Sequence, residues 1–354
     1  MAIETQQLMR QLDGRVAAAD SAAAPRIAVV IPCYRERDHV LDVIARIPAI
    51  VANIICVDDG CPDRTGELVE SEAHDPRVQV SYSPQNEGVG GATKRGFVAA
   101  LRAGADIVVK LDGDGQMDPD LIASLTAPII AGQADYAKGN RFFSLENIAT
   151  MPRYRIIGNV VMSFVSKFSS GYWNIFDPAN GFIAIHASVL RMLPLGRISD
   201  DYFFESDMLF RLSTLRAVVI DVPMHAQYGS EQSHLDVFRS LPTFIGKHIG
   251  NFAKRIFYSY FLRNFSVASI QWLLGPLLVL FGIVFGTYAW RVAEADEVAA
   301  TAGTVMLAAL PIIIGLQFIL AAIDYDVRSV PATPLHRLVS KHLLNDHPGS
   351  IRID

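Results

Sequence analysis

Cysteine and charge are both scarce in this sequence of 354 residues. The three cysteines form no Cys-x-x-Cys pair, so a disulfide framework is not expected, and we predict that Cys33, Cys56 and Cys61 are free thiols that fill apolar space. Charged residues make up only 19% of the chain, and the formal net charge is −5. That balance excludes the strongly basic surface of a protein that binds nucleic acid.

Apolar residues are correspondingly frequent. They make up 51% of the chain, and the mean hydropathy is +0.28. This composition excludes disorder for most of the chain and favours membrane segments. We expect no export signal at the N-terminus, because residues 1–24 include acidic side chains and no apolar run follows a basic start. We therefore expect a flexible arm over 1–24 and a domain behind it that stays in the cytoplasm.

Short apolar runs alternate with helical patterns between residues 25 and 235. This alternation predicts an α/β domain with a mostly parallel, Rossmann-like sheet. Ligands of such sheets bind beyond the carboxyl ends of the strands, and three of the four apolar runs end in polar residues suited to a ligand. The predicted strands are 27–32, 54–59, 78–83 and 106–112, and the predicted helices include 38–47 and 91–103.

The C-terminal third contains two long stretches without a charged residue, 264–290 and 298–323. A helix needs about 20 apolar residues to cross the hydrocarbon core of a membrane. We therefore predict a transmembrane hairpin over 266–323, with helices near 267–290 and 299–323; a buried hairpin in a soluble core is the alternative. Within it, a Gly-x-x-x-Gly pair at 282 and 286 permits close helix approach or serves packing inside the hairpin.

Charge flanking the hairpin predicts its orientation. Basic residues precede the first span and follow the second, whereas the connecting loop holds one arginine against three acids. The positive-inside rule then puts the catalytic domain and both termini in the cytoplasm, with 324–354 as a tail. Residues 236–265 mix aromatic with basic side chains and are predicted to form helices in the headgroup layer, or else an ordinary surface helix. The expected protein is integral to the inner or plasma membrane.

Two carboxylates follow the last of the four predicted strands. Asp112 and Asp114 lie one residue apart, with glycines at 113 and 115 that let a ligand approach the backbone, and Gln116 adds a neutral oxygen. Oxygen ligands of this kind predict Mg²⁺ or Mn²⁺. An EF-hand calcium loop is excluded, because the glycine and glutamate that it needs at its sixth and twelfth positions are absent. A solvated acidic turn is the remaining alternative.

Polar residues also end the first two predicted strands. Pro32, Tyr34 and Glu36 follow the first, and Asp58 and Asp59 end the second. A carboxylate in such a pocket can accept a hydrogen bond from a nucleobase N–H. Alternatively, Asp59 caps a helix or forms a turn.

A glycine-rich run, 86–96, opens the next helix. Its residues Gly88, Gly91 and Lys94 are candidates to hold phosphate. The run is a poor dinucleotide fingerprint, because Thr93 stands where a third glycine is required.

Five segments together resemble one known family: IPCYRERDHV, VDDGCPDRT, NEGVGGATKRG, DGDGQMDPD and DPANGF. The stretch 25–235 resembles the family 2 glycosyltransferases of GT-A fold, and within them the polyprenyl-phosphate glycosyltransferases, including dolichol-phosphate mannose synthase. The resemblance implies a nucleotide-sugar donor (UDP or GDP), a divalent cation, and transfer of a hexose-type sugar to a polyprenyl phosphate at the cytoplasmic membrane face. Membrane lipids are the implied surroundings, and a homo-oligomer is left open.

The same resemblance implies roles for particular residues. Asp112, Asp114 and Gln116 match the metal motif, and Pro32, Tyr34, Glu36 and Asp59 match the nucleotide pocket. Arg141 and Arg155 resemble the basic pair that meets the acceptor phosphate, and Asn159 stands where a small polar residue often follows. Asp114, Arg141 and Arg155 are the expected catalytic residues. One departure is the run 225–235, where Gln227, Ser233 and His234 replace a more basic pattern.

Other functions differ from this one in the acceptor of the sugar and in whether that acceptor needs a general base. A phosphate monoester is already anionic, so it needs no general base, and direct displacement would invert the anomeric configuration. A glycolipid synthase with a neutral lipid hydroxyl acceptor would need a base, for which Glu205 and Asp207 are the candidates. A processive polysaccharide synthase is expected to carry a Gln-x-x-Arg-Trp motif, which is absent. An inactive recruitment module is disfavoured by the intact carboxylate pair.

Overall fold

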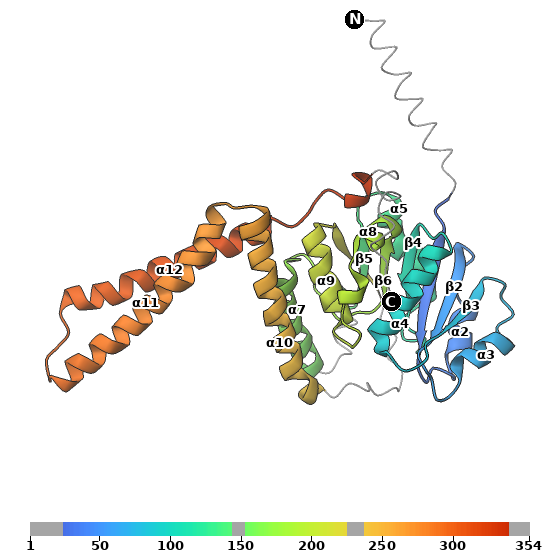
Figure 1. The fold of residues 1–354 in the computed structure, drawn as a ribbon, viewed down its shortest axis with the longest axis horizontal. Helices are drawn as coiled ribbons and strands as arrows, with labels where there is room; N and C mark the ends of the chain where they lie inside the picture. Colours follow the sequence, from blue (N-terminus) through green and yellow to red (C-terminus); the bar gives the residue numbers. More distant parts are fainter. Residues whose placement is uncertain (1–23, 144–152, 225–236, 340–354) are drawn as a thin grey trace, which may run out of the picture.

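A seven-stranded sheet forms the centre of the N-terminal part of the molecule (Figure 1). The computed structural model describes residues 24–143, 153–224 and 237–339. The strand order is β3-β2-β1-β4-β6-β5-β7, and β6 runs antiparallel to both of its neighbours while the other pairs are parallel. The strands are β1 (Ile27–Cys33), β2 (Val51–Asp58), β3 (Val78–Tyr82), β4 (Ile107–Lys110), β5 (Tyr136–Asn140), β6 (Ile183–His186) and β7 (Val219–Pro223).

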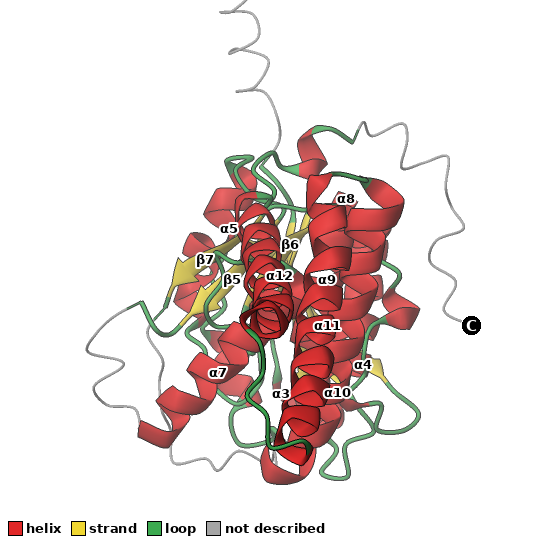
Figure 2. Cartoon of the chain, turned by 90° about the vertical axis from the view of Figure 1, so that its left-hand side faces the viewer, coloured by secondary structure: helices red, strands yellow, loops and turns green. Residues whose placement is uncertain are grey.

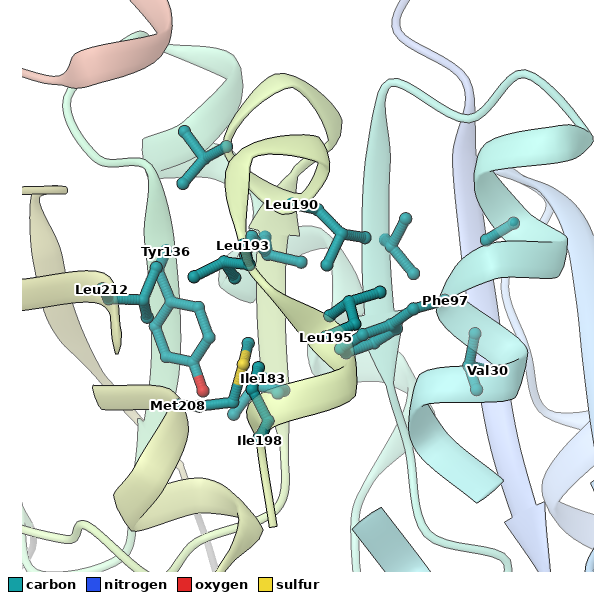
Figure 3. Packing of buried hydrophobic residues seen from close by; sticks show 14 of the residues in the cluster. Val30, Phe97, Tyr136, Ile183, Leu190, Leu193, Leu195, Ile198, Met208 and Leu212 are labelled. Atoms are coloured by element: carbon teal, nitrogen blue, oxygen red, sulfur yellow. The ribbon is translucent and has the colours of Figure 1, made fainter. Parts of the chain in front are cut away.

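Helices cover both faces of this sheet. The sheet and these helices are called the sheet domain. Along β1, Val29 and Ile31 belong to one buried cluster and Ala28 and Val30 to the other, because successive strand residues point to opposite faces. The first cluster includes residues of α2 (Val40–Ala45), α3 (Thr65–Glu72) and α5 (Ile122–Ile130). The second includes residues of α4 (Gly88–Arg102), α8 (Ala187–Met192) and α9 (Phe204–Leu215). Figure 3 shows part of it, where Phe97, Tyr136 and Met208 reach from separate elements into one core.

The four strands and two helices predicted from the sequence are confirmed as β1–β4, α2 and α4, with boundaries shifted by at most three residues. The α/β fold class is also confirmed. β5, β6 and β7, together with α7 (Arg153–Ser170), were not among the expected elements. The three cysteines are free and buried, as predicted. The predicted arm lies outside the described residues, apart from its last position.

Two long helices project from the sheet domain side by side (Figure 1). They are α11 (Val267–Ala295) and α12 (Ala302–Arg328), and both are long and apolar enough to cross a membrane by length and composition. α12 continues five residues beyond the expected end of the second span, at 323. Before them, α10 (Val237–Ile256) and a π-helix, η3 (Phe257–Arg263), run along the side of the sheet domain.

Glycines allow α11 and α12 to pack closely. A Cβ atom on Gly315 would lie 2.7 Å from the carbonyl oxygen of Gly275, and one on Gly282 would lie 2.6 Å from that of Ala308. Any larger residue at these positions would force the helices apart. Of the two roles considered for the pair at 282 and 286, packing inside the hairpin is therefore the one observed.

After α12 the chain returns to the sheet domain and docks on Asp135, which is fully buried. The Asp135 carboxylate accepts the backbone N–H groups of Val218, Leu335 and His336 at 2.7–2.8 Å, and its Oδ1 lies 2.7 Å from His336 Nδ1. The His336 ring also stacks on His186, with ring centroids 4.4 Å apart. Burial beside His336 lowers the pKa of His186 to about 4, so His186 is neutral at pH 7. One carboxylate thus fastens the end of the hairpin to the sheet.

We expect Asp135→Ala to lower the free energy of unfolding by roughly 2–4 kcal/mol, because it leaves several donors without an acceptor. Burial alone would raise the pKa of Asp135, but its hydrogen-bond donors outweigh burial and lower it. The contribution is therefore complete above about pH 4 and is lost as the pH falls through the folded-state pKa. Thermal unfolding of the full chain in neutral detergent at pH 7 and pH 3 measures both effects. Asp324→Ala, at an exposed ion pair, is the control; equal losses for the two variants at pH 7 would contradict this account.

Candidate active site

The carboxyl ends of β1, β2 and β4 meet at one edge of the sheet, because the three strands are parallel neighbours. β1 leads into a turn in which Tyr34 is exposed and Arg35 has a left-handed φ of 65°. The turn after β4 packs on the same segment, since a Cβ on Gly113 would lie 3.3 Å from the Cβ of Glu36. The structure thus brings the predicted metal turn and the predicted nucleotide residues of β1 together, with Pro32 half-buried beneath them.

Asp58 and Asp59 end β2 and hold two loops by their side chains. The buried Asp58 carboxylate accepts the N–H groups of Cys61 and Gly66 at 2.8 and 2.7 Å. The Asp59 carboxylate accepts those of Glu87 and Gly88, both at 2.9 Å. Burial raises the pKa of Asp59, while the two N–H bonds oppose the rise. Asp59 thus holds the start of α4 from a distant part of the chain; a nucleobase contact stays a prediction.

The glycine-rich start of α4 packs tightly against the turn 199–201. Gly90 and Gly91 donate their N–H groups to the Asp200 carbonyl at 2.8 and 3.2 Å, and a Cβ on Gly88 would lie 2.6 Å from that oxygen. Lys94 forms an ion pair with Asp200 and donates to the carbonyl of Ile198. Close packing therefore explains why glycines occupy these positions. Phosphate binding by Gly88, Gly91 and Lys94 stays a prediction, and for the glycines it requires exchange of these bonds.

The turn after β4 presents three oxygen-bearing side chains near the surface. Asp112, Asp114 and Gln116 are partly exposed, and Asp114 Oδ1 accepts the Gln116 N–H at 2.9 Å. Within the described residues, no group of three or more His, Cys, Asp or Glu side chains is placed to hold a metal. Mg²⁺ is commonly held by one or two carboxylates while water and substrate phosphates complete its shell. The oxygen set of this turn fits a cation of that type, Mg²⁺ or Mn²⁺.

A buried lysine lies behind the predicted metal turn, which follows β4 and carries Asp112, Asp114 and Gln116. Lys110 is 1% exposed, and its Nζ lies 2.7 Å from Asp112 Oδ1 and 3.2 Å from Glu205 Oε1. Burial alone would lower the pKa of Lys110, but the two carboxylates outweigh burial and raise it, so the lysine stays charged. Lys110 therefore positions Asp112 and engages Glu205. It was not among the predicted residues; the signal was a lysine inside an otherwise apolar strand.

Asp207, the second candidate base, joins three elements. Its carboxylate accepts the N–H of Ser199 at 3.1 Å and the side-chain amide of Asn251 at 3.0 Å. Asp207 is buried, and its bond with Asn251 is a polar contact between α9 and α10. These bonds give Asp207 a structural role.

Arg141, which follows β5, is held by a carboxylate of the segment 177–182. Its Nε and Nη2 donate to the two oxygens of Asp177 at 2.8 and 2.9 Å. Asn180, on the same segment, donates to the carbonyl of Gly139 at 2.8 Å. A Cβ on Gly181 would lie 2.8 Å from Asp112 Oδ2. The segment 177–182 thus links the arginine to the metal turn, although none of its residues was predicted to have a role.

A second buried lysine lies below this segment. Lys138 is fully buried on β5 and donates to the carbonyl of Asn180. Burial lowers the pKa of Lys138 to about 8, although Asp177, Glu205 and Asp221 oppose the shift. Burial likewise raises the pKa of Asp221 to about 6. The floor of the site is therefore a network of opposed charges.

The remaining predicted acceptor residues lie on α7 or beyond it. Arg155 lies in the first turn of α7, and its side chain is outside the described residues. Asn159 is half-buried one turn further on. Residues 225–235, including Gln227, Ser233 and His234, also lie outside the described residues.

Comparisons with known proteins agree with this fold. The model of the family Glycosyl transferase family 2 matches residues 28–193. The chain is 34% identical over 181 residues to UDP-N-acetylglucosamine--dolichyl-phosphate N-acetylglucosaminyltransferase of Methanococcus voltae, covering 47% of this chain and 72% of the relative. It is 32% identical over 206 residues to polyprenol monophosphomannose synthase of Mycolicibacterium smegmatis, covering 56% of this chain and 76% of the relative.

Among solved structures, the fold resembles glucosyl-3-phosphoglycerate synthase of Mycobacterium tuberculosis bound to UDP. The TM-score is 0.51 at 19% identity, over 65% of this chain and 80% of that one. Structures of that synthase also contain Mn²⁺ or Mg²⁺ with UDP. The mostly parallel sheet with a carboxylate turn after its fourth strand is thus a GT-A glycosyltransferase fold. The chain belongs to glycosyltransferase family 2 and is a glycosyltransferase.

Proposed function

We propose that the protein transfers a hexose-type sugar from a UDP- or GDP-sugar to a polyprenyl phosphate at the cytoplasmic face of the membrane, with Mg²⁺ or Mn²⁺. The carboxyl ends of β1, β2 and β4, with the turns that follow them, are called the active edge. The observation that carries this proposal is the placement of the active edge beside two helices whose apolar side chains face outward. Relatives named as acting on dolichyl or polyprenyl phosphate support the same acceptor class.

The helix α7 exposes its apolar side chains and buries its polar ones. Ile157, Val161 and Phe164 are 55–65% exposed, whereas Ser166 and Ser169 are at most 3% exposed. In a water-soluble protein the apolar face turns inward. The reversed arrangement suits a helix whose outer face lies against lipid.

The helix α10 is arranged in the same way. Ile245 and Ile249 are exposed, while His248 and Asn251 are buried. His248 Nδ1 lies 2.8 Å from Ser169 Oγ, so the polar faces of α7 and α10 contact each other. Viewed from the side on which the hairpin projects, both helices lie toward the viewer (Figure 2). Two apolar faces beside a candidate membrane hairpin favour a membrane-facing surface that leads to the active edge.

The proposed reaction needs no general base. A phosphate monoester is largely ionised near pH 7, so its oxygen attacks the anomeric carbon directly. The bond from that carbon to the nucleoside diphosphate breaks on the opposite side, which inverts the anomeric configuration. Asp112, Asp114 and Gln116 would hold the cation, which neutralises charge on the leaving diphosphate when bound. Arg141, oriented by Asp177, and Arg155 would bind the acceptor phosphate.

A neutral hydroxyl acceptor fits the geometry less well. Such an acceptor must lose a proton to a base. Glu205 is paired with the buried Lys110, and Asp207 accepts bonds from Ser199 and Asn251. Both candidate bases are therefore engaged within the protein.

The metal proposal predicts that Asp114→Asn lowers transfer by at least roughly 100-fold, the scale of a lost electrostatic group. The fold should persist, because Asp114 lies in a partly exposed turn. Transfer from a panel of nucleotide sugars to undecaprenyl phosphate is measured with Mg²⁺, Mn²⁺ or excess chelator, and Asp120→Asn in the same segment is the control. Full turnover in excess chelator would rule out the cation.

The acceptor proposal predicts that Arg155→Ala lowers transfer roughly 30- to 150-fold, corresponding to about 2–3 kcal/mol of charge-assisted bonding. Binding of the nucleotide sugar, measured by calorimetry, should change little. Arg153→Ala removes the same charge two residues away and is the matched control. If the two variants have equal lipid kinetics in neutral detergent, Arg155 acts only through local charge and the proposed contact is wrong.

We also propose that both termini are cytoplasmic. The loop between α11 and α12 carries acids, whereas Lys254 and Arg263 precede the hairpin. Single cysteines at positions 299 and 345 test this with an impermeant thiol reagent on intact cells, and the buried native cysteines keep the background low. We expect labelling at 299 alone. Labelling at 345 alone would reverse the proposed orientation.

A further inference from the structure

A second polar site lies where the sheet domain meets the base of the hairpin. It is a pocket of about 390 Å³ lined by the ends of α7, α9, α10, η3 and α12. Its charged lining residues are three arginines, Arg216, Arg255 and Arg263, against one acid, Asp326. The pocket therefore has an excess of positive charge.

The acid is already satisfied inside the protein. Both oxygens of Asp326 accept bonds from the guanidinium of Arg255, at 2.7 and 2.9 Å. The hydroxyl of Tyr260 and the indole N–H of Trp173 also donate to Asp326, at 2.6 and 2.9 Å. Arg255 and Asp326 are both buried, and they neutralise each other. The excess charge of the pocket therefore comes from its two other arginines.

Arg216 and Arg263 are exposed and are held by backbone carbonyls. Arg216 Nη2 donates to Ser329 at 3.1 Å, and Arg263 Nη1 donates to Thr214 at 2.7 Å. Across the described ranges, neither arginine forms an ion pair. Two guanidinium groups at one pocket, each oriented but not neutralised, suit a phosphate group, which guanidinium binds through paired hydrogen bonds.

The position of the pocket selects the source of the phosphate. Leu262, Phe265 and Val267, which flank Arg263 in the sequence, are 65–71% exposed, and the candidate span α11 begins at Val267. On the proposed membrane placement, the pocket therefore lies at the level of the lipid headgroups. Basic side chains at this level attract anionic lipids.

This pocket is separate from the active edge. Glu205 lies at the start of α9 and Arg216 just after its end, so roughly 16 Å of helix, at 1.5 Å per residue, separates them. The acceptor proposed above would bind near Arg141, at the edge where α9 begins.

We propose that this pocket binds the phosphate of an anionic phospholipid and so seats the sheet domain on the membrane. The inference rests on the proposed membrane placement, and it does not depend on the identity of the sugar acceptor. Free phosphate and polyprenyl phosphate share the same chemistry, and the experiment separates these sources.

The test uses the full chain in neutral detergent, with thermal stability and native mass spectrometry as readouts. Phosphatidylglycerol, phosphatidylcholine, inorganic phosphate and undecaprenyl phosphate are titrated separately. We expect phosphatidylglycerol to raise the unfolding temperature and to stay bound in the spectrometer, at concentrations where phosphatidylcholine and inorganic phosphate do neither. Undecaprenyl phosphate is expected to bind at the proposed acceptor site, so its response should be the same in the parent and in the pocket variant. The double variant Arg216→Asn with Arg263→Gln should need at least tenfold more phosphatidylglycerol. Asparagine is chosen at 216 because φ there is 60°.

Two matched variants accompany it. Arg291→Gln with Arg328→Gln removes the same charge from the hairpin outside the pocket and should respond as the parent does. Arg216→Lys with Arg263→Lys keeps the charge and should retain most of the response. If the Asn/Gln pair does not fold, Arg263→Gln alone replaces it with the same expectation.

Several outcomes would overturn the inference. These are an unchanged phosphatidylglycerol response in the pocket variant, an equal response to phosphatidylcholine, and an equal response to inorganic phosphate. An undecaprenyl phosphate response that is lost in the pocket variant, with no response to phosphatidylglycerol, would overturn it as well, by assigning the pocket to the acceptor. Transfer activity is measured in parallel. In the parent chain, transfer without a phosphatidylglycerol response would show that the lipid proposal has failed. A phosphatidylglycerol response without transfer would show that the proposed function has failed.

Discussion

The buried ion pair between Arg255 and Asp326 joins α10 to the second helix of the hairpin, and the packing at the base of the hairpin depends on it. Removing two charges from water is costly unless each gains several partners. Arg255 also donates to the carbonyl of Phe168, on α7, and Asp326 accepts bonds from Trp173 and Tyr260. The pair therefore ties α7, α10, η3 and α12 together at one point. Replacing either partner would leave a buried charge in the junction, so the angle of the hairpin is coupled to the packing of the sheet domain.

Buried lysines and carboxylates of opposite charge also lie beneath the active edge. The strand order reverses direction between β1 and β4, which is where open α/β sheets bind ligands. Buried lysines occur on β4 and β5, and each lies among carboxylates: Lys110 beside Asp112 and Glu205, and Lys138 near Asp177. In a low-dielectric interior such groups persist only when they are paired. The pairs hold the exposed acids and Arg141 in position before any ligand arrives.

Local sequence patterns were sufficient for the first half of the sheet and for the hairpin. The apolar runs of β1–β4 and the charge-free stretches of α11 and α12 carry their own signals. β5 does not, because its five residues include a lysine, a glycine and an asparagine that only tertiary contacts can bury. The same limit applies to the glycine-rich start of α4. Its composition suggests a phosphate loop, whereas its contacts with Asp200 depend on a segment more than 100 residues away.

That distant segment, the turn 199–201, connects α10 to the start of α4. Lys247 on α10 forms an ion pair with Asp201 at 2.6 Å, and the neighbouring Asp200 carbonyl accepts the N–H groups of Gly90 and Gly91. α10 is thus held near its C-terminal end by Arg255 and at its middle by Lys247. The turn 199–201 therefore contacts both α10 and the start of α4. The glycines of α4 are therefore required by close packing against the same turn that contacts α10.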